Sequence, residues 1–179
     1  PLFVGGAIGL SNIGTVGGVN TTPSVSQVYA TGAVNGTGGS PSYLGGLVGF
    51  NGGSITQSYW DSYTTGRAPG LGSGSSAGLT AVTSDPAQSA AANYAFKQSA
   101  YGNFDFAAGN TAAGWFMIDG RTRPFGQWEY STNIANSHQL QLMAMDLGAS
   151  YKLASAIDFS SGLAVAGKYP GMWSSSGFS

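Results

Sequence analysis

Two stretches of the sequence repeat one pattern in which glycines alternate with apolar residues. Residues 3–10 read FVGGAIGL and residues 43–50 read YLGGLVGF. A second pair follows in the same order, SVSQVYATG at 24–32 and SITQSYWDS at 54–62. Repetition at a spacing of about 30 to 40 residues is typical of architectures in which each copy buries its apolar face against the next. This repeat constrains the fold more than any other feature.

The repeated stretches have the alternation of β-strands. Val4 and Ile8 in the first copy match Leu44 and Val48 in the second, and each pair lies on one face of a strand. Glycine weakens an isolated strand, so its regular use indicates that neighbouring backbones approach closely. The sequence therefore predicts a mainly β fold in which the copies stack as successive layers of a β-solenoid, with one or two short flanking helices.

Two glutamines occupy matching places in the second pair of stretches. Gln27 and Gln57 have the same parity as the apolar residues around them. One interpretation is a structural ladder of stacked amides between the copies, which satisfies buried polar groups. The other is that one or both side chains point outward at a bend.

Charged residues make up only 7% of the chain, with six basic and seven acidic side chains. No basic patch can be assembled from so few cations, which argues against nucleic acid as a partner. The chain has no cysteine, so disulfides and thiolate metal sites are excluded. It shows neither a signal peptide nor an apolar run long enough for a transmembrane segment, and we expect an excerpt of a longer protein.

The repeats resemble a family of bacterial surface proteins. GGAIGL and GGLVGF, each followed by turn residues, SxxQxY and then TG or DS, resemble GLUG-type repeats. The wider stretches QVYATGAVNG and YLGGLVGFNGGSITQSYWDSYTTG are similar to the repeat region of filamentous-haemagglutinin-like adhesins of two-partner secretion systems. Downstream, GWFMIDGRTRPFGQW resembles the segment that closes such an array, and residues 134–160 resemble the start of the next one. The resemblance implies a right-handed parallel β-helix, export through an outer-membrane transporter partner and attachment at the cell surface.

Four segments follow from these patterns. We expect repeats over 1–66, a Gly/Ser loop over 67–84, a short helix with array-closing strands over 85–130, and a short helix with the start of a second β array over 131–179. Asp85 or Ser84 is placed to cap the first helix, which we expect to continue to about residue 100, because Pro86 suits a first helical turn. Asn136 or Ser137 is placed to cap the second, which we expect to end near residue 148.

No catalytic constellation stands out in the sequence. The single histidine, His138, belongs to no metal or triad motif, and a hydrogen bond at a helix terminus is its expected role. The seven acidic residues are scattered, and Asp61 suits a turn or cap. We therefore predict no catalytic residues, no metal and no cofactor, although β-helices that act on polysaccharides keep a lyase or hydrolase as an alternative.

The side chains suited to a ligand are aromatic or cationic. Aromatic rings offer platforms to sugar faces, and the RTR cluster could hold an anion or a glycan. The speculative ligand-binding residues are Tyr63, Arg121, Arg123 and Trp173. The alternatives are core packing for the rings, which we favour for Trp115 and Trp128, and a pairing of one arginine with Asp119 or Glu129.

The expected function is a non-enzymatic, rod-forming segment of a secreted bacterial adhesin. Its partners would be glycans or proteins of host or bacterial cell surfaces, contacted through loops such as 14–22 and 67–84. Besides the polysaccharide enzyme, the alternative is an extracellular fibre or matrix subunit that self-associates through unpaired edge strands.

Overall fold

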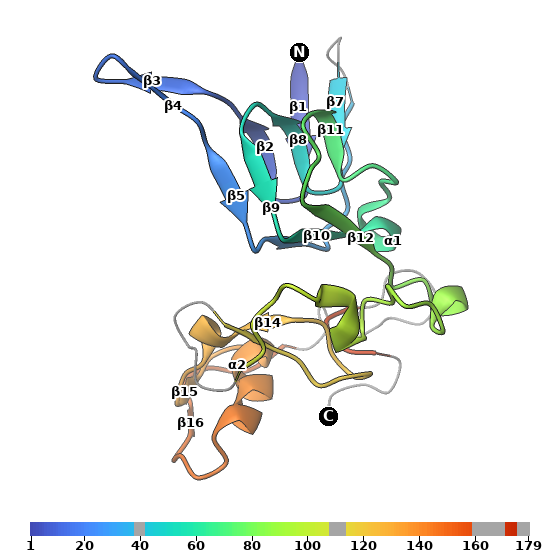
Figure 1. The fold of residues 1–179 in the computed structure, drawn as a ribbon. Coiled ribbons are helices and arrows are strands. Elements are labelled where there is room, and N and C mark those ends of the chain that lie inside the picture. Colours follow the sequence, from blue (N-terminus) through green and yellow to red (C-terminus); the bar gives the residue numbers. More distant parts are fainter. Residues whose placement is uncertain (38–41, 108–113, 159–170, 175–179) are drawn as a thin grey trace. The chain divides into compact units, whose positions relative to one another are not determined.

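The computed structural model describes residues 1–37, 42–107, 114–158 and 171–174 (Figure 1). The chain divides into two compact units, Pro1–Ala95 (unit 1) and Phe96–Ser179 (unit 2).

Unit 1 holds three successive sets of short strands. Set 1 comprises β1 (Leu2–Gly5), β2 (Ile8–Ser11), β5 (Ser24–Ser26) and β6 (Tyr29–Ala30). Set 2 comprises β7 (Ser42–Gly45), β8 (Val48–Asn51), β9 (Ser54–Thr56) and β10 (Ser58–Asp61). Set 3 comprises β11 (Leu71–Gly74) and β12 (Leu79–Val82). The hairpin β3 (Gly14–Val16) and β4 (Val19–Thr21) lies between β2 and β5, and the helix α1 (Ser62–Thr65) follows β10.

Corresponding strands of sets 1 and 2 pair side by side and parallel. Val4 pairs with Leu44 in β1–β7, and Ile8 pairs with Val48 in β2–β8. The same holds for β5–β9 and β6–β10. The strands of set 3 continue two of these sheets, in the orders β11-β8-β2 and β12-β10-β6. Residues that were matched in the sequence are therefore partners in the structure.

The expected right-handed parallel β-helix, or solenoid, is wrong. The described residues are mainly β with little helix, but they form seven separate sheets of two or three strands, and two of these sheets are antiparallel. The strands are only two to four residues long, because Gly-Gly turns and bends at residues 27 and 57 interrupt them. Between residues 83 and 158 the glycine-spaced phrase does not recur, and the described strands there do not add to the stacked sets.

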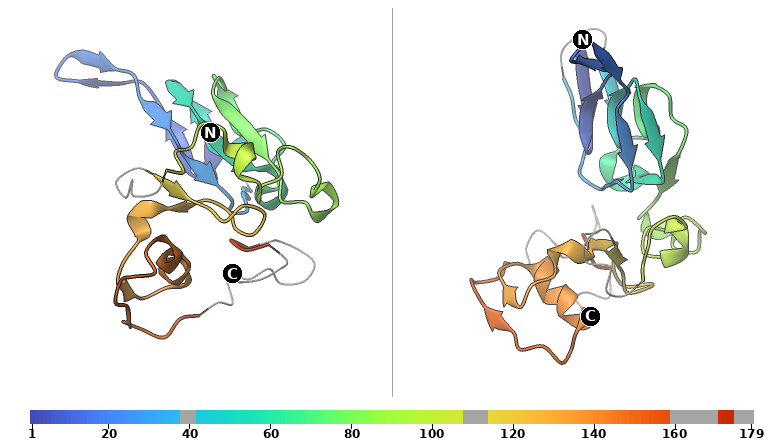
Figure 2. Two further views of the ribbon diagram at one scale, coloured as in Figure 1. Left: turned by 60° about the horizontal axis from the view of Figure 1, so that its bottom comes forward. Right: turned by 60° about the vertical axis from the view of Figure 1, so that its left-hand side comes forward.

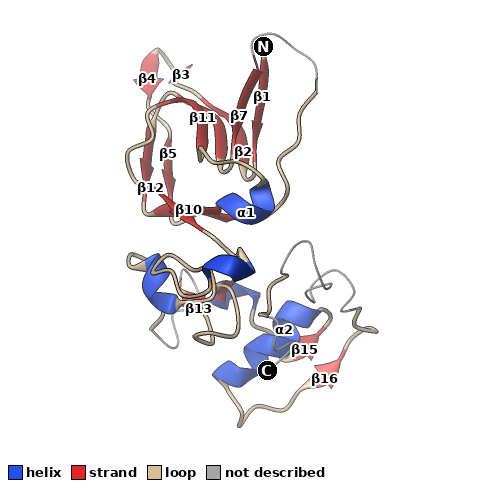
Figure 3. Cartoon of the chain, turned by 90° about the vertical axis from the view of Figure 1, so that its right-hand side faces the viewer, coloured by secondary structure: helices blue, strands red, loops and turns tan. Residues whose placement is uncertain are grey.

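The alternate glycines allow two layers of backbone to touch. The pair β1–β7 packs against the sheet β11-β8-β2 (Figure 3). A Cβ placed on Gly49 would lie 2.5 Å from the carbonyl oxygen of Gly9 and 2.6 Å from the amide of Val4. On Gly72 it would lie 2.6 Å from the amide of Leu44. Real Cβ atoms do not come so close, so this packing requires glycine at these places.

The core of unit 1 combines side chains from β8 and the residue before it with side chains from β5, β6, β9 and β10. Its buried side chains are Val25, Ala30, Leu47, Val48, Ile55 and Trp60. The indole of Trp60 packs against both Gly46 and Gly70, and its Nε1 donates a hydrogen bond to the carbonyl of Arg67 at 3.0 Å. The two glycines thus leave room for the largest ring of this core.

The segment 67–84 is not the loop that its Gly/Ser composition predicted. It contributes β11 and β12, which pair with β8 and β10 of set 2. Leu71 pairs with Val48, so Leu71 and Gly72 take the same places as Val48 and Gly49. Residues 67–84 thus contain a shortened copy of the repeat, although their composition is typical of a loop.

The expected helix from residue 86 to about 100 is also wrong. Asp85 does act as a cap, because its side chain accepts a hydrogen bond from Ala87 N at 3.0 Å. The element that follows, however, is only the 3₁₀ turn η1 (Pro86–Gln88). The chain then returns to Thr83, which donates to Asn93 O and accepts from Ala95 N. These tertiary hydrogen bonds override helix propensity, and helical geometry resumes only in η2 (Gln98–Tyr101).

Two other expected caps are confirmed. Asp61 precedes α1 and accepts from the amides of Tyr63 and Thr64, and Asn136 precedes α2 (Ser137–Leu142) and accepts from the amide of Gln139. Helix α2 is shorter than expected: a 3₁₀ turn, η4 (Met143–Met145), succeeds it and ends before residue 148.

Unit 2 combines short strand pairs with these turns (Figure 2). Its strands are β13 (Trp115–Phe116) antiparallel to β14 (Phe125–Gly126), and β15 (Asn133–Ile134) parallel to β16 (Lys152–Leu153). The turn η3 (Gln127–Glu129) follows β14. A core cluster is formed by Phe125, Leu142 and Trp173. In the segment 131–179, where the start of a second β array was expected, the described residues hold only the strand pair β15–β16 with α2 and η4 between its strands. Residues 159–170 and 175–179 of that segment lie outside the described residues.

Candidate functional site

Among the described residues of unit 1, three of the four exposed large apolar side chains lie in the hairpin β3–β4 or directly before it. Its turn, Gly17-Gly18, has φ values of +58° and +81°, which only glycine adopts readily and which match the favoured two-residue hairpin turn. Thr15 Oγ1 donates to Asn20 Oδ1 across the strands at 2.9 Å, and Thr21 Oγ1 donates to Gly14 O at 3.1 Å. The hairpin is therefore an ordered element within the predicted loop 14–22.

Three large apolar side chains of this region face solvent. Val16 is 71% exposed, Val19 is 66% exposed and Ile13, just before β3, is 51% exposed. Val16 and Val19 are cross-strand partners, so their side chains lie on the same face next to the turn. Residues 12–22 carry no charge. We call the surface formed by Val16 and Val19 the hairpin face; it suits contact with an uncharged partner surface.

The four predicted ligand-binding residues do not form one site. Tyr63 is half-buried in α1 of unit 1, while Arg121 is exposed in unit 2. Arg123 is 1% exposed, with its guanidinium 5.5 Å from the ring centre of Phe96. Trp173 is fully buried, and its Nε1 donates to Gln141 Oε1 at 2.8 Å.

Backbone pairing does bring three of these residues close together. Arg123 N donates to Met172 O at 2.8 Å, and Ser174 N donates to Arg121 O at 2.7 Å. The segments are thus joined by their main chains, while the Arg123 and Trp173 side chains serve the interior rather than a ligand surface.

Of the two rings expected in the core, Trp115 is buried, whereas Trp128 is 50% exposed.

The two glutamines lie next to each other, but at a bend. Gln27 Nε2 lies 3.5 Å from Gln57 Oε1, and the Gln57 side chain is exposed. Both residues have positive φ, +53° and +48°, where the chain passes from one strand to the next. The outward interpretation therefore describes them better than a ladder of buried amides.

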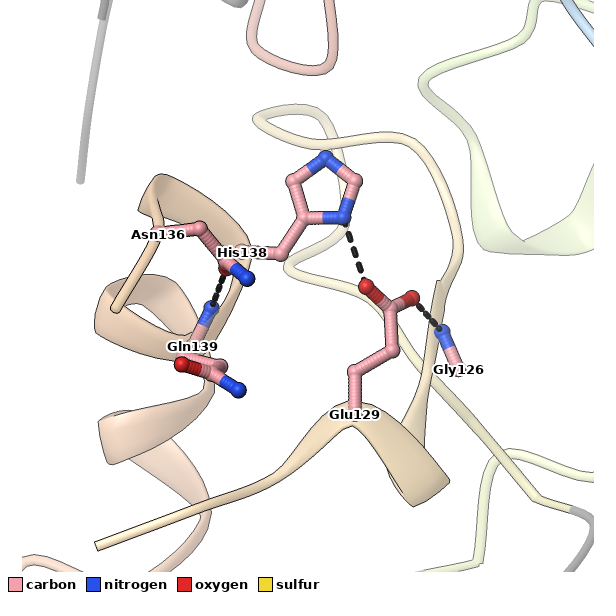
Figure 4. A network of polar contacts seen from close by, with 5 residues as sticks. All are labelled: Gly126, Glu129, Asn136, His138 and Gln139. Atoms are coloured by element: carbon pink, nitrogen blue, oxygen red, sulfur yellow. Dashed lines mark hydrogen bonds and ion pairs between the residues drawn. The ribbon is translucent and has the colours of Figure 1, made fainter. Parts of the chain in front are cut away.

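The single histidine pairs with a glutamate in unit 2. Nδ1 of His138, in the first turn of α2, lies 2.8 Å from Oε2 of Glu129 (Figure 4). The other carboxylate oxygen accepts from the amide of Gly126 at 3.2 Å. Burial alone would raise the pKa of Glu129, but the hydrogen bond and charge of His138, with the Gly126 amide, outweigh it and hold the pKa below its ordinary value of 4.5. Neither arginine takes Glu129 as the partner that the sequence suggested.

This pair predicts acid sensitivity of unit 2. Because the folded-state pKa of Glu129 is lowered, its stabilisation is fully present above the unfolded value near 4.5 and is lost as the pH falls through the folded value. We expect the melting temperature of the chain to fall more between pH 5 and pH 3 than that of Glu129→Gln, measured by circular dichroism. Equal losses in the two proteins would contradict this assignment.

Most acidic side chains accept hydrogen bonds from the backbone. Each accepts a hydrogen bond from at least one main-chain amide, and the six that do so are Asp61, Asp85, Asp105, Asp119, Glu129 and Asp146. Within the described ranges, three or more His, Asp or Glu side chains do not gather as metal ligands would. Across the same residues, no helix has the length and apolarity needed to cross a membrane.

Sequence reasoning missed the hairpin face and the positive φ of the glutamines. The signal for the hairpin was present, because Val16-Gly17-Gly18-Val19 places two glycines between β-branched residues. The glutamines gave no signal, since glutamine is not a residue type that favours positive φ.

No protein-family model matches the chain, and no match was found among curated proteins or solved structures. The resemblance to GLUG-type repeats thus rests on the quoted sequence motifs.

Proposed function

We propose that the chain is a non-enzymatic attachment segment of a secreted bacterial surface adhesin. The observation that carries the proposal is the hairpin face, where the paired Val16 and Val19 are 71% and 66% exposed on an ordered and uncharged hairpin. Patches of this kind mark contact surfaces for other molecules when they are held on a stable scaffold. The paired strand sets of unit 1 supply that scaffold.

The surface chemistry supports an extracellular setting. With 7% charged residues, the chain depends on Ser, Thr, Asn, Gln and Gly for its polar surface. This composition accompanies the motifs that resemble two-partner adhesins. The partners proposed are uncharged regions of cell-surface glycans or proteins, with an outer-membrane transporter for export.

The acidic side chains favour attachment over polysaccharide cleavage. A glycosidase needs two carboxyl groups held about 5 to 10 Å apart around the scissile bond. Here six acidic side chains accept from main-chain amides, and Asp61 is fully buried as a helix cap. Their observed contacts are those of caps and turns.

The proposal predicts that the hairpin valines carry binding. In Val16→Ser/Val19→Ser the turn glycines and cross-strand hydrogen bonds stay, while the apolar contact surface is lost. We expect binding to cells and to glycan arrays to fall at least about tenfold, since two buried valines contribute more than 1.4 kcal/mol. Leu147→Ser/Leu153→Ser, which removes two exposed leucines of unit 2, is the matched control and should bind normally.

Two results would contradict the proposal. One is equal binding by the hairpin variant and the original chain. The other is release of reducing ends from a polysaccharide, which would identify an enzyme.

A further inference from the structure

Unit 2 holds a partly enclosed cavity of about 230 Å³. Most of its wall is apolar and is formed by Phe106, Phe116, Met117 and Met145. Two of these side chains, Phe116 and Met145, also pack against the core cluster of this unit. No charged side chain of the described residues lines the cavity. A charged ligand would lose its hydration there without gaining a partner, so the cavity suits an uncharged molecule.

One polar side chain in the wall carries an unused acceptor. Gln127 is 1% exposed, and its Nε2 donates to Ala107 O and to Trp115 O, both at 2.8 Å. These two carbonyls fix the orientation of the amide, because a flipped amide would set its oxygen against both of them. Oε1 is then buried without a donor from any residue that the structure describes. Since an unpaired buried acceptor is destabilising, an occupant that donates a hydrogen bond is favoured.

The size and chemistry of the wall limit the occupant further. An apolar cavity of about 150 Å³ is enough to bind benzene, so 230 Å³ admits a somewhat larger ring system. Aromatic side chains and methionine sulfurs both make favourable contacts with a bound ring. A single water molecule would satisfy the acceptor but would leave most of the apolar wall without contacts.

We propose that this cavity binds a small uncharged aromatic molecule that donates one hydrogen bond, a class that indole represents. The ring system packs against the two phenylalanines and the two methionines of the wall. Its N–H or O–H group donates to Gln127 Oε1. The inference assigns a ligand site to unit 2, goes beyond the proposed function and does not depend on the hairpin face.

The test is a titration of the whole chain with indole, followed by NMR of ¹³C-labelled methionine methyl groups. Met117 and Met145 line the cavity, so the ring current of a bound indole should shift their signals until they saturate. Met143 and Met172 do not line it and serve as internal controls whose signals should change little.

A matched ligand tests the hydrogen bond. Benzofuran has the shape of indole but carries an oxygen in place of the N–H group, so it cannot donate to Gln127 Oε1. We expect indole to bind at least about fivefold more tightly than benzofuran. Equal affinities would overturn the assignment of Gln127 as the acceptor.

A matched pair of variants tests the location. Ala144 is an exposed residue of η4 in the cavity wall, and Ala144→Phe adds a ring there, which we expect to raise the dissociation constant of indole at least about tenfold. Ala154→Phe, at an exposed residue of the same unit outside the cavity, should bind indole normally.

Two further results would overturn the proposal. One is the absence of saturable shifts at Met117 and Met145 up to the solubility limit of indole. The other is unchanged indole binding by Ala144→Phe. Val16→Ser/Val19→Ser should still bind indole, and Ala144→Phe should still bind cells, so failure of this proposal is distinguishable from failure of the attachment function.

Discussion

Replacing Gly46 by alanine is expected to destabilise unit 1 by about 3 kcal/mol. The added methyl group would overlap Cδ1 of Trp60 and would lie 2.8 Å from its Nε1. The ring is equally close to Gly70, where a Cβ would lie 2.5 Å from its Cε3, so the indole is packed directly against both glycines. Relief requires either a new rotamer for Trp60, which breaks its hydrogen bond to Arg67 O, or separation of the strand sets.

Urea unfolding followed by far-UV circular dichroism measures this effect. The matched control is Gly32→Ala, also in unit 1, where an added Cβ meets nothing within 4 Å. We expect its stability to change by less than about 0.5 kcal/mol. Similar losses in the two variants would show that glycine flexibility, and not the contact with Trp60, explains the requirement.

Replacing Asp61 by alanine is expected to cost about 3 kcal/mol of stability. Its Oδ1 accepts from the amides of Tyr63 and Thr64 in α1 and from Ser84, 23 residues further along the chain, at 3.1 Å. The Asp61 side chain and Ser84 are both fully buried, so the amides left unpaired cannot all turn to water. One carboxylate therefore joins the end of β10 to the segment that follows β12.

Asp85 provides the comparison for this cap. It accepts from Ala87 N and from Gln88 Nε2 at a solvent-facing turn. Asp85→Ala should therefore cost only about 1 kcal/mol. Asp61→Asn, which keeps the accepting oxygen, should fall between the two alanine variants. Equal stability of Asp61→Ala and Asp85→Ala in urea unfolding would exclude a bridging role for Asp61.

The sequence predicted those parts of the fold that depend on local pattern. Alternation located the strands of the two copies, and the matched pair Val25 and Ile55 became direct cross-strand partners. The predicted caps were correct for Asp61, Asp85 and Asn136. A short polar side chain directly before a turn or helix can accept hydrogen bonds from the first amides that follow it. These signals operate within a few residues.

The rest depended on contacts between distant segments. A helix beginning at Pro86 was outcompeted by hydrogen bonds to Thr83, and β11 paired with β8 despite a composition typical of a loop. For Arg123 the sequence suggested a ligand contact or an ion pair, and for Trp173 either a ligand contact or core packing; unit 2 uses both side chains to fill its interior. None of these outcomes has a periodic signature.

The candidate site was located in part. Segment 14–22 was expected to be presented to partners, and it holds the exposed hairpin, but its valines were not singled out because they read as ordinary loop residues. His138 was expected to bond at a helix terminus, and it does lie in the first turn of α2. Its partner, Glu129, was not predictable because it comes from η3, which precedes the helix and folds back onto it.

The central structural claim is that the two glycine-spaced copies lie strand against strand. Nuclear Overhauser contacts between backbone protons in a uniformly labelled sample test it most directly. If the two copies pair in this way, contacts are expected between residues 4 and 44 and between residues 25 and 55, which no local structure can produce. Assigned spectra in which both pairs lack such contacts, while each copy contacts other segments, would contradict it.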